Sequence, residues 1–67
     1  MTVAKVSEIT STSAKSFQDA IDNGIKRASK TLKNLTNAWI ADQEVEIAQG
    51  KVTAYRVRLR VTFVLEE

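Results

Sequence analysis

Apolar side chains recur at intervals of three and four residues through residues 16–35. This spacing is typical of one face of an α-helix, and nearly all the intervening positions are polar. Ser16 can accept a hydrogen bond from a free backbone N–H of the first turn, and Asp19 stands where a capping box places an acid. We predict an amphipathic helix over residues 16–35. Its apolar face consists of Phe17, Ala20, Ile21, Ile25, Ala28, Leu32 and Leu35.

Residues 52–65 give the clearest period-two pattern of apolar and mostly polar side chains in the sequence, which predicts a long β-strand. Residues 39–48 form a second extended segment, and Gly50 lies in the turn between the two, where its backbone freedom favours a tight hairpin. One face of the later strand is unbroken apolar surface on which the helix can pack. That face carries Tyr55, Val57, Leu59, Val61, Phe63 and Leu65.

The charges of the two segments predict their register. A three-residue loop, residues 49–51, opposes acids to arginines on one face and apolar residues to each other on the other. A one-residue slip exchanges the two faces, so only this register satisfies both patterns. The predicted pairs are Val45–Tyr55, Gln43–Val57, Ala41–Leu59 and Trp39–Val61 on the apolar face, and Ala48–Val52, Glu46–Ala54, Glu44–Arg56, Asp42–Arg58 and Ile40–Arg60 on the other.

The N-terminal segment, residues 2–9, is short and rich in β-branched side chains, which favours a strand. Residues 10–13 are all Ser or Thr and predict a polar turn leading to the helix cap. The order is therefore strand, helix, strand, strand. We predict an α+β fold in which a three-stranded antiparallel sheet wraps on one helix, forming a single domain over residues 1–67.

Composition narrows the function classes. The 67 residues include no Cys and no His, which excludes disulfides, thiol chemistry and imidazole as a base or metal ligand. Small domains without such crosslinks commonly rely on oligomerisation, so we expect self-association. A net charge of +2 with interspersed signs does not favour nucleic acid as a partner. No apolar stretch approaches a membrane span and no signal peptide begins the sequence, so we expect a cytoplasmic protein.

Two charged stripes are candidate ligand sites. Arg56, Arg58 and Arg60 share one strand face and present guanidiniums that can hold phosphate groups. Asp42, Glu44 and Glu46 share the facing strand and carry oxygen ligands suited to calcium or magnesium. Cross-strand ion pairing between the two stripes is the favoured interpretation of both.

The sequence resembles the dodecins over essentially its whole length. The resemblance rests on Ala-Ser-Lys-Thr-Leu-Lys-Asn-Leu at residues 28–35, Gly-Lys-Val at 50–52 and Tyr-Arg-Val-Arg-Leu-Arg-Val-Thr-Phe-Val-Leu-Glu at 55–66. It implies a hollow shell of twelve subunits with the sheet wrapped on the helix. It also implies that flavins bind in pairs across two-fold axes, each ring stacked on a tryptophan, without catalysis.

The flavin-contacting positions depart from the family's pattern. Asn37 stands where the resemblance places the stacking tryptophan, and Arg56 stands where it places a glutamine that contacts the flavin ring. Trp39 lies two residues further along the same strand face, opposite Val61. It is either a substitute stacking ring or a residue that packs in the core or at a subunit interface. This pattern resembles dodecin-like proteins that lack the flavin tryptophan.

Two functions from different classes follow. The first is a non-catalytic homo-oligomer, expected to be a dodecamer, that stores riboflavin, FMN or a related cofactor at Trp39, Asn37 and Arg56. The second is a structural shell that has lost the flavin site and binds a phosphate-bearing ligand or a cation.

Overall fold

The computed structural model describes residues 2–65 and contains three strands and one helix in the order β-α-β-β. The elements are β1 (Ala4–Ser13), α1 (Phe17–Ala28), β2 (Leu35–Ala48) and β3 (Lys51–Val64). The predicted fold class is confirmed. The outermost residues of the predicted domain lie outside the described residues, and so does Glu66 at the end of the dodecin-like sequence.

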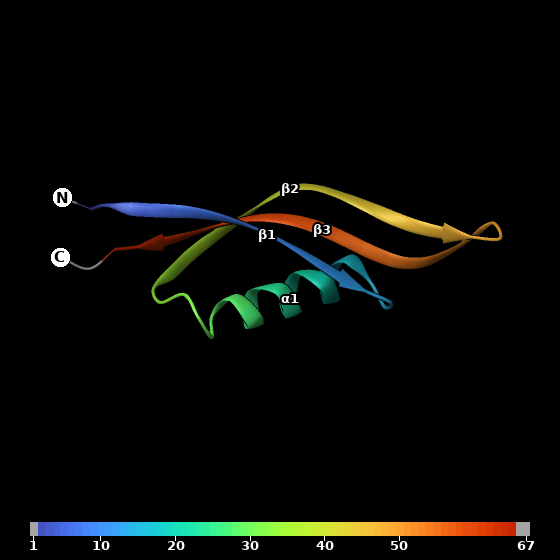
Figure 1. Ribbon diagram of the computed structural model, residues 1–67, viewed down its shortest axis with the longest axis horizontal. Helices are drawn as coiled ribbons and strands as arrows, with labels where there is room; N and C mark the ends of the chain where they lie inside the picture. The colour runs from blue at the N-terminus through green and yellow to red at the C-terminus, as the bar shows by residue number, and fades with distance from the viewer. Residues whose placement is uncertain (1, 66–67) are drawn as a thin grey trace.

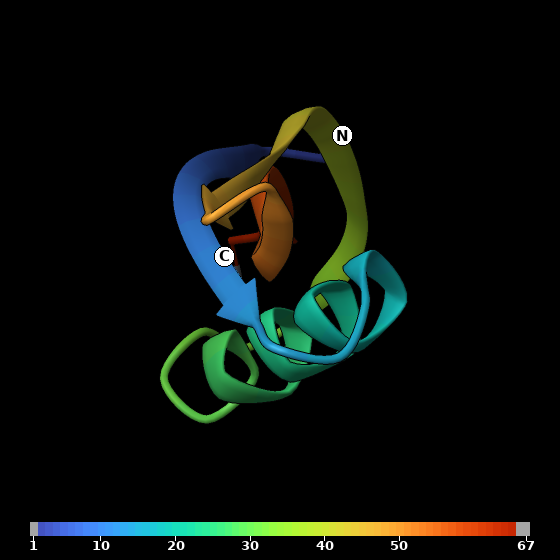
Figure 2. The same ribbon diagram turned by 90° about the vertical axis from the view of Figure 1, so that its right-hand side faces the viewer.

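The three strands form one antiparallel sheet in the order β1-β3-β2, so β3 is the central strand. In Figures 1 and 2 the helix α1 lies against one face of this sheet, beneath its middle. Strand β1 is longer than predicted, because residues 10–13 continue it instead of forming a turn. Thr10 and Thr12 pair there with Arg58 and Arg56 of β3, and β-branched threonines favour extended backbone.

Helix α1 begins as predicted but ends early. The Ser16 hydroxyl accepts a hydrogen bond from the Asp19 N–H at 3.0 Å, which confirms the N-cap. The Asp19 carboxylate accepts instead from Ser13 at 2.6 Å, so no reciprocal capping box closes. The prediction that the helix reaches residue 35 is wrong: it ends at Ala28.

Residues beyond the helix still follow its apolar pattern, which explains the overestimate. Leu32 and Leu35 both pack against the core, one from the turn after α1 and the other from the first residue of β2. Between them Asn34 takes a φ of 62°, a left-handed conformation that a helix cannot contain. Spacing alone does not distinguish this path from two more helical turns.

The core lies between α1 and the middle of β3. Val57, Leu59 and Val61 alternate along β3 toward the helix and are essentially inaccessible to solvent, as is Ala20 on the facing side of α1. Gly24 sets the distance between the layers, because a Cβ there would lie 3.0 Å from the Cβ of Ser11 and 3.3 Å from Leu59. The glycine that weakens the helix therefore permits close packing.

The middle of the β2–β3 hairpin has the predicted register. Five predicted pairs are confirmed, including both acid–arginine pairs. They are Val45–Tyr55, Gln43–Val57, Glu46–Ala54, Glu44–Arg56 and Asp42–Arg58.

Both ends of the hairpin differ from the prediction. The loop has two residues, Gln49 and Gly50, each with positive φ, and Ala48 pairs with Lys51 instead of Val52. A bulge beside Glu46 compensates for the loop being one residue shorter than predicted, so the pairs in the middle of the hairpin are the predicted ones.

A second bulge, between Ile40 and Asp42, changes the pairing toward the start of β2. Ile40 pairs with Leu59, and Trp39 pairs with Arg60. The predicted pairs Trp39–Val61, Ala41–Leu59 and Ile40–Arg60 are therefore wrong. The bulge moves Trp39 from the helix-facing side of the sheet to the opposite side.

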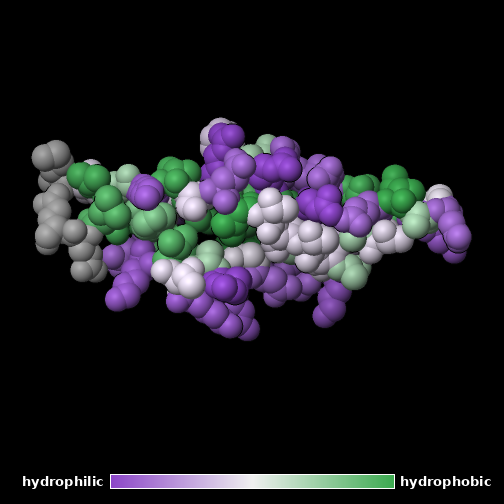
Figure 3. All heavy atoms as spheres, viewed as in Figure 1, coloured by the Kyte–Doolittle hydropathy of each residue, from purple (hydrophilic) through white to green (hydrophobic). Residues whose placement is uncertain are grey.

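The described residues form an elongated body with principal extents of 52 × 19 × 13 Å. The distal part of the hairpin projects past the helix, whereas the start of β1 and the end of β3 lie toward the other end of the sheet (Figure 1). Apolar side chains gather toward both ends of the surface in Figure 3, beyond the region that the helix covers. Within residues 2–65 no helix is long and apolar enough to span a bilayer.

Candidate ligand-binding face

The sheet surface opposite α1, which we call the outer face, carries every candidate site residue predicted from the sequence. Val57, Leu59 and Val61 point to the helix, so the residues between them on β3 point outward. The register then places their partners on β1 and β2 beside them. The outer face comprises Thr12, Thr10, Glu8 and Val6 from β1, Arg56, Arg58, Arg60 and Thr62 from β3, and Glu46, Glu44, Asp42, Trp39 and Asn37 from β2.

The hairpin half of the outer face is a ladder of ion pairs. One guanidinium nitrogen of Arg58 donates to both carboxylate oxygens of Asp42, at 2.7 and 2.8 Å. Arg56 pairs with Glu44 at 3.2 Å and also with Glu46. The predicted cross-strand pairing is confirmed. Each carboxylate of the predicted cation stripe is bound to an arginine, and no cluster of three metal-ligating side chains occurs within residues 2–65.

Trp39 occupies the other half of the outer face. Trp39 is 61% exposed in the single chain, so the interpretation that it packs in the core of the chain is wrong, whereas packing at a subunit interface stays a prediction. The Arg60 guanidinium carbon lies 4.9 Å from the indole centroid, within cation–π range. Arg60 also donates through Nε to Glu8 at 3.2 Å, which holds the guanidinium beside the ring.

Asn37 lies near Trp39, but Arg56 does not. Asn37 pairs with Thr62 on the same face, two residues along β2 from Trp39, and its amide oxygen accepts from the Thr36 hydroxyl at 2.9 Å. Arg56 lies four residues along β3 from Arg60, which is about 13 Å at 3.3 Å per residue. Within one chain the three predicted site residues share a face without forming one pocket.

Glu8 is a site residue that the sequence did not single out. It positions Arg60 from the edge strand β1. The contact of Glu8 with Arg60 depends on the register between β1 and β3. The N-terminal segment has no pattern of opposed charges, like that of the hairpin, from which this register could be predicted. The alternation of Glu8 with Ile9 indicates only that Glu8 lies on the polar face of a strand.

Comparison with known proteins assigns the family. The sequence profile of the Dodecin family matches residues 3–66. The chain belongs to the dodecin family. A search of curated protein sequences finds no match to it.

Solved dodecin structures superpose closely on this chain. The dodecin from Streptomyces davaonensis is 33% identical, with a TM-score of 0.93 over 98% of this chain and 97% of its own. An arginine-to-alanine mutant of the Thermus thermophilus dodecin is 34% identical, with a TM-score of 0.94 over the full length of both chains. The calcium dodecin from Mycobacterium tuberculosis, described as calcium-chelating, is 29% identical, with a TM-score of 0.83 over 96% of this chain and 91% of its own.

Family membership establishes part of the function. Dodecins are non-catalytic ligand-binding proteins and generally homododecamers, which bind flavins or, in the mycobacterial member, calcium. Nothing in the comparisons places this dodecin among relatives without the stacking tryptophan, and it carries Trp39.

Proposed function

We propose that this dodecin is a cytoplasmic homododecamer that sequesters riboflavin, FMN or a related aromatic cofactor without catalysis. The observation that supports it is the exposure of Trp39. A solitary indole that is 61% exposed on a sheet face offers apolar area for a planar ring. Arg60 contacts the indole, so a ligand ring would stack on the area that the guanidinium leaves uncovered.

Asn37 and Arg56 would supply polar contacts to the bound ring. Asn37 lies beside Trp39, whereas Arg56 lies about 13 Å away along the sheet. A site that uses all three residues therefore needs two copies of the chain, with the Arg56 end of one outer face against the Trp39 end of another. A two-fold axis produces this antiparallel arrangement and repeats the site.

Titration of riboflavin and FMN with the purified protein, followed by flavin fluorescence, tests the proposal. We expect quenching at micromolar protein, and about tenfold weaker binding in Trp39→Ala, since ring stacking contributes about 1–3 kcal/mol. Trp39→Phe is the matched control, because it keeps an aromatic ring and should retain most of the affinity. Flavin fluorescence that does not change with wild-type protein would refute flavin binding.

The Arg56 contact has a separate test with riboflavin, which carries no phosphate. Arg56→Gln should strengthen riboflavin binding, because a neutral amide can donate to and accept from the flavin ring while the arginine is held by Glu44 and Glu46. Unchanged riboflavin binding in Arg56→Gln would remove Arg56 from the site, whereas weaker binding would mean that the arginine itself is the better contact.

The second candidate is a shell without a flavin site that binds a phosphate-bearing ligand or a cation. It has less support, because the arginines and carboxylates of the outer face are paired with each other. A protein that assembles fully and binds neither flavin would favour it, and a calcium titration of the same sample would then test the cation.

A further inference from the structure

The opposite side of the sheet contains a groove that the flavin proposal does not use. It lies between the edge strand β1 and the second half of α1, and it has a volume of about 470 Å³. This volume falls within the range of about 300–1,000 Å³ that is typical of small-molecule sites. Trp39 lies on the outer face and does not line it. The groove is lined by Ser7, Ile9, Thr10, Ser11, Asn23, Gly24, Arg27, Ala28, Thr31 and Leu32.

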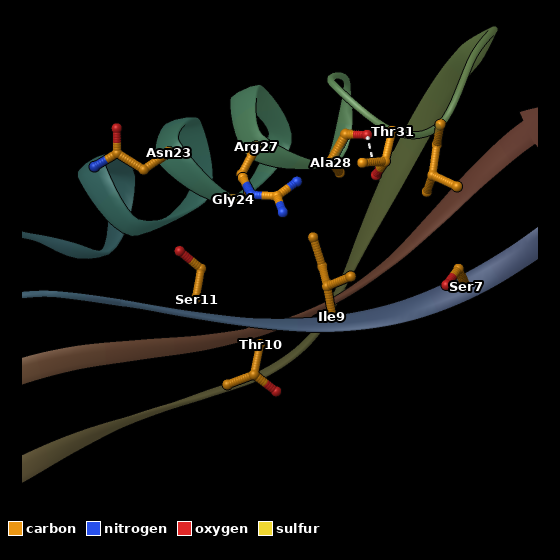
Figure 4. A pocket seen from close by; sticks show the side chains of 10 residues that line it. Ser7, Ile9, Thr10, Ser11, Asn23, Gly24, Arg27, Ala28 and Thr31 are labelled. Carbon is orange, nitrogen blue, oxygen red and sulfur yellow. Dashed lines mark hydrogen bonds between the residues drawn. The ribbon is translucent and has the colours of Figure 1, made fainter.

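The side of β1 that faces the helix carries both apolar side chains and hydroxyl groups, so the groove offers both kinds of contact. Figure 4 shows Ile9 and Ser11 directed from β1 toward the helix, whereas Thr10 points to the other side of the sheet. Ile9 and Leu32 supply apolar surface. Within residues 2–65, no hydrogen bond from a protein group occupies the hydroxyl of Ser7 or Ser11, so both remain available to a ligand.

Arg27 is the charged group of the groove. In Figure 4 its guanidinium lies between the helix and Ile9. The arginines at 56, 58 and 60 each pair with a carboxylate, but among residues 2–65 Arg27 has no ion pair. Lys26 and Lys30 neighbour it in sequence, and neither forms an ion pair with a carboxylate among residues 2–65.

We propose that this groove binds a small organic anion, with Arg27 holding its phosphate or carboxylate and Ile9 and Leu32 contacting its apolar part. A guanidinium presents parallel N–H groups that match two oxygens of either anion. The Ser11 hydroxyl, on the opposite wall, donates to a remaining oxygen. Gly24 keeps this wall near the helix, since a Cβ at residue 24 would lie 3.3 Å from the Ser11 hydroxyl oxygen.

Phenyl phosphate is a suitable probe, because it combines one phosphate with a compact apolar ring. Saturation-transfer difference NMR on the assembled protein should detect its binding, with the phenyl protons receiving saturation. Arg27→Gln should weaken that binding by about tenfold, since hydrogen bonds to charged groups are the strong ones. Arg27→Lys keeps the positive charge but loses the two parallel N–H groups of the guanidinium, so this variant should bind phenyl phosphate with intermediate affinity. Inorganic phosphate should compete poorly, because it lacks the ring.

Two controls separate the groove from other sites. Lys26→Gln removes the same charge from the adjacent helical residue outside the groove lining, and should change phenyl phosphate binding less than twofold. Trp39→Ala should leave it unchanged, so failure of the flavin site does not affect this result. Absence of saturation transfer to phenyl phosphate with wild-type protein would overturn the proposal. An equal loss in Lys26→Gln, or a loss in Trp39→Ala, would also overturn it.

Discussion

Two parts of the same hairpin have opposite environments on the side of the sheet that faces α1. In the central part, Val57 and Leu59 are 0% exposed beneath the helix. The end of the hairpin that projects past the helix, residues 47–52, is called the distal arm here; in it, Ile47 is 66% exposed and Val52 is 48% exposed. Both parts belong to the continuous strands β2 and β3. The strand pattern thus determines which face is apolar, and the helix determines how much of that face one chain can bury.

The helix is too short to cover the sheet. Its 12 residues span about 18 Å at 1.5 Å per residue, whereas the 14 residues of β3 span about 46 Å at 3.3 Å per residue. The distal arm therefore keeps an apolar face and two paired strands without a covering layer. Burial against other copies of the chain, as in the homododecamer that we propose, would resolve this imbalance, and dodecins are generally homododecamers.

The largest loss should follow truncation in the covered centre. Leu59→Ala removes a fully buried side chain beneath α1 and should lower the free energy of unfolding by about 3 kcal/mol. Urea denaturation at one fixed protein concentration measures this loss. Val52→Ala in the distal arm is the comparison and should lose less, because one chain leaves Val52 48% exposed. Equal losses would mean that other copies bury the arm as fully as the helix buries the centre.

A smaller loss should follow the addition of one methyl group between the layers. Gly24→Ala places a Cβ about 3.0 Å from Ser11, so the helix must move away from β1. We expect destabilisation by about 1–2 kcal/mol, because overpacking outweighs the gain of about 1 kcal/mol in helix propensity. Asn23→Ala, which changes the neighbouring exposed residue, provides the control in thermal unfolding. A stabilised Gly24→Ala variant would contradict close packing at this point.

Charge reversal in the outer-face ladder should cost about 1 kcal/mol. Arg58→Glu puts two carboxylates opposite each other, because residue 58 pairs with Asp42 across the strands. Its effect on the unfolding midpoint should shrink as salt screens the repulsion. A salt titration of the unfolding midpoint measures this, and Arg58→Gln separates repulsion from loss of the ion pair. An effect of Arg58→Glu that is independent of salt would contradict an electrostatic origin.

The smallest intrachain effect should come from a near-isosteric change in the arm. Val52→Thr alters a half-exposed side chain and should change intrachain stability by less than about 0.5 kcal/mol. If neighbouring copies bury the arm, the same change should promote dissociation several-fold on dilution, since buried apolar area is lost. Size-exclusion chromatography over a dilution series measures it. Dissociation identical to the wild type would place Val52 outside the interfaces.

Much of the fold follows from the sequence, because two periodic patterns reinforce each other. The alternation along β3 and the opposed charges of β2 determine the central register, and the cap at Ser16 determines the start of α1. The end of α1 was not predictable from spacing. Leu32 and Leu35 reach the same core from a turn and a strand, so their positions preserve the helical pattern without a helix.

The candidate site was predictable in its residues but not in its geometry. Trp39 changes face because of the bulge between Ile40 and Asp42, and no glycine in that segment marks the bulge. The contact of Glu8 with Arg60 depends on pairing between the two ends of the chain, which local patterns do not encode. The separation of Arg56 from Trp39 likewise emerges only from the three-dimensional register.

Light scattering of the purified protein at low micromolar concentration tests the central claim most directly. Burial of the distal arm by other copies predicts one species of about twelve times the 7.4 kDa chain mass, the number twelve coming from the dodecin family. It also predicts an unfolding midpoint that rises with protein concentration. A folded species of 7.4 kDa whose midpoint does not depend on concentration would contradict the account.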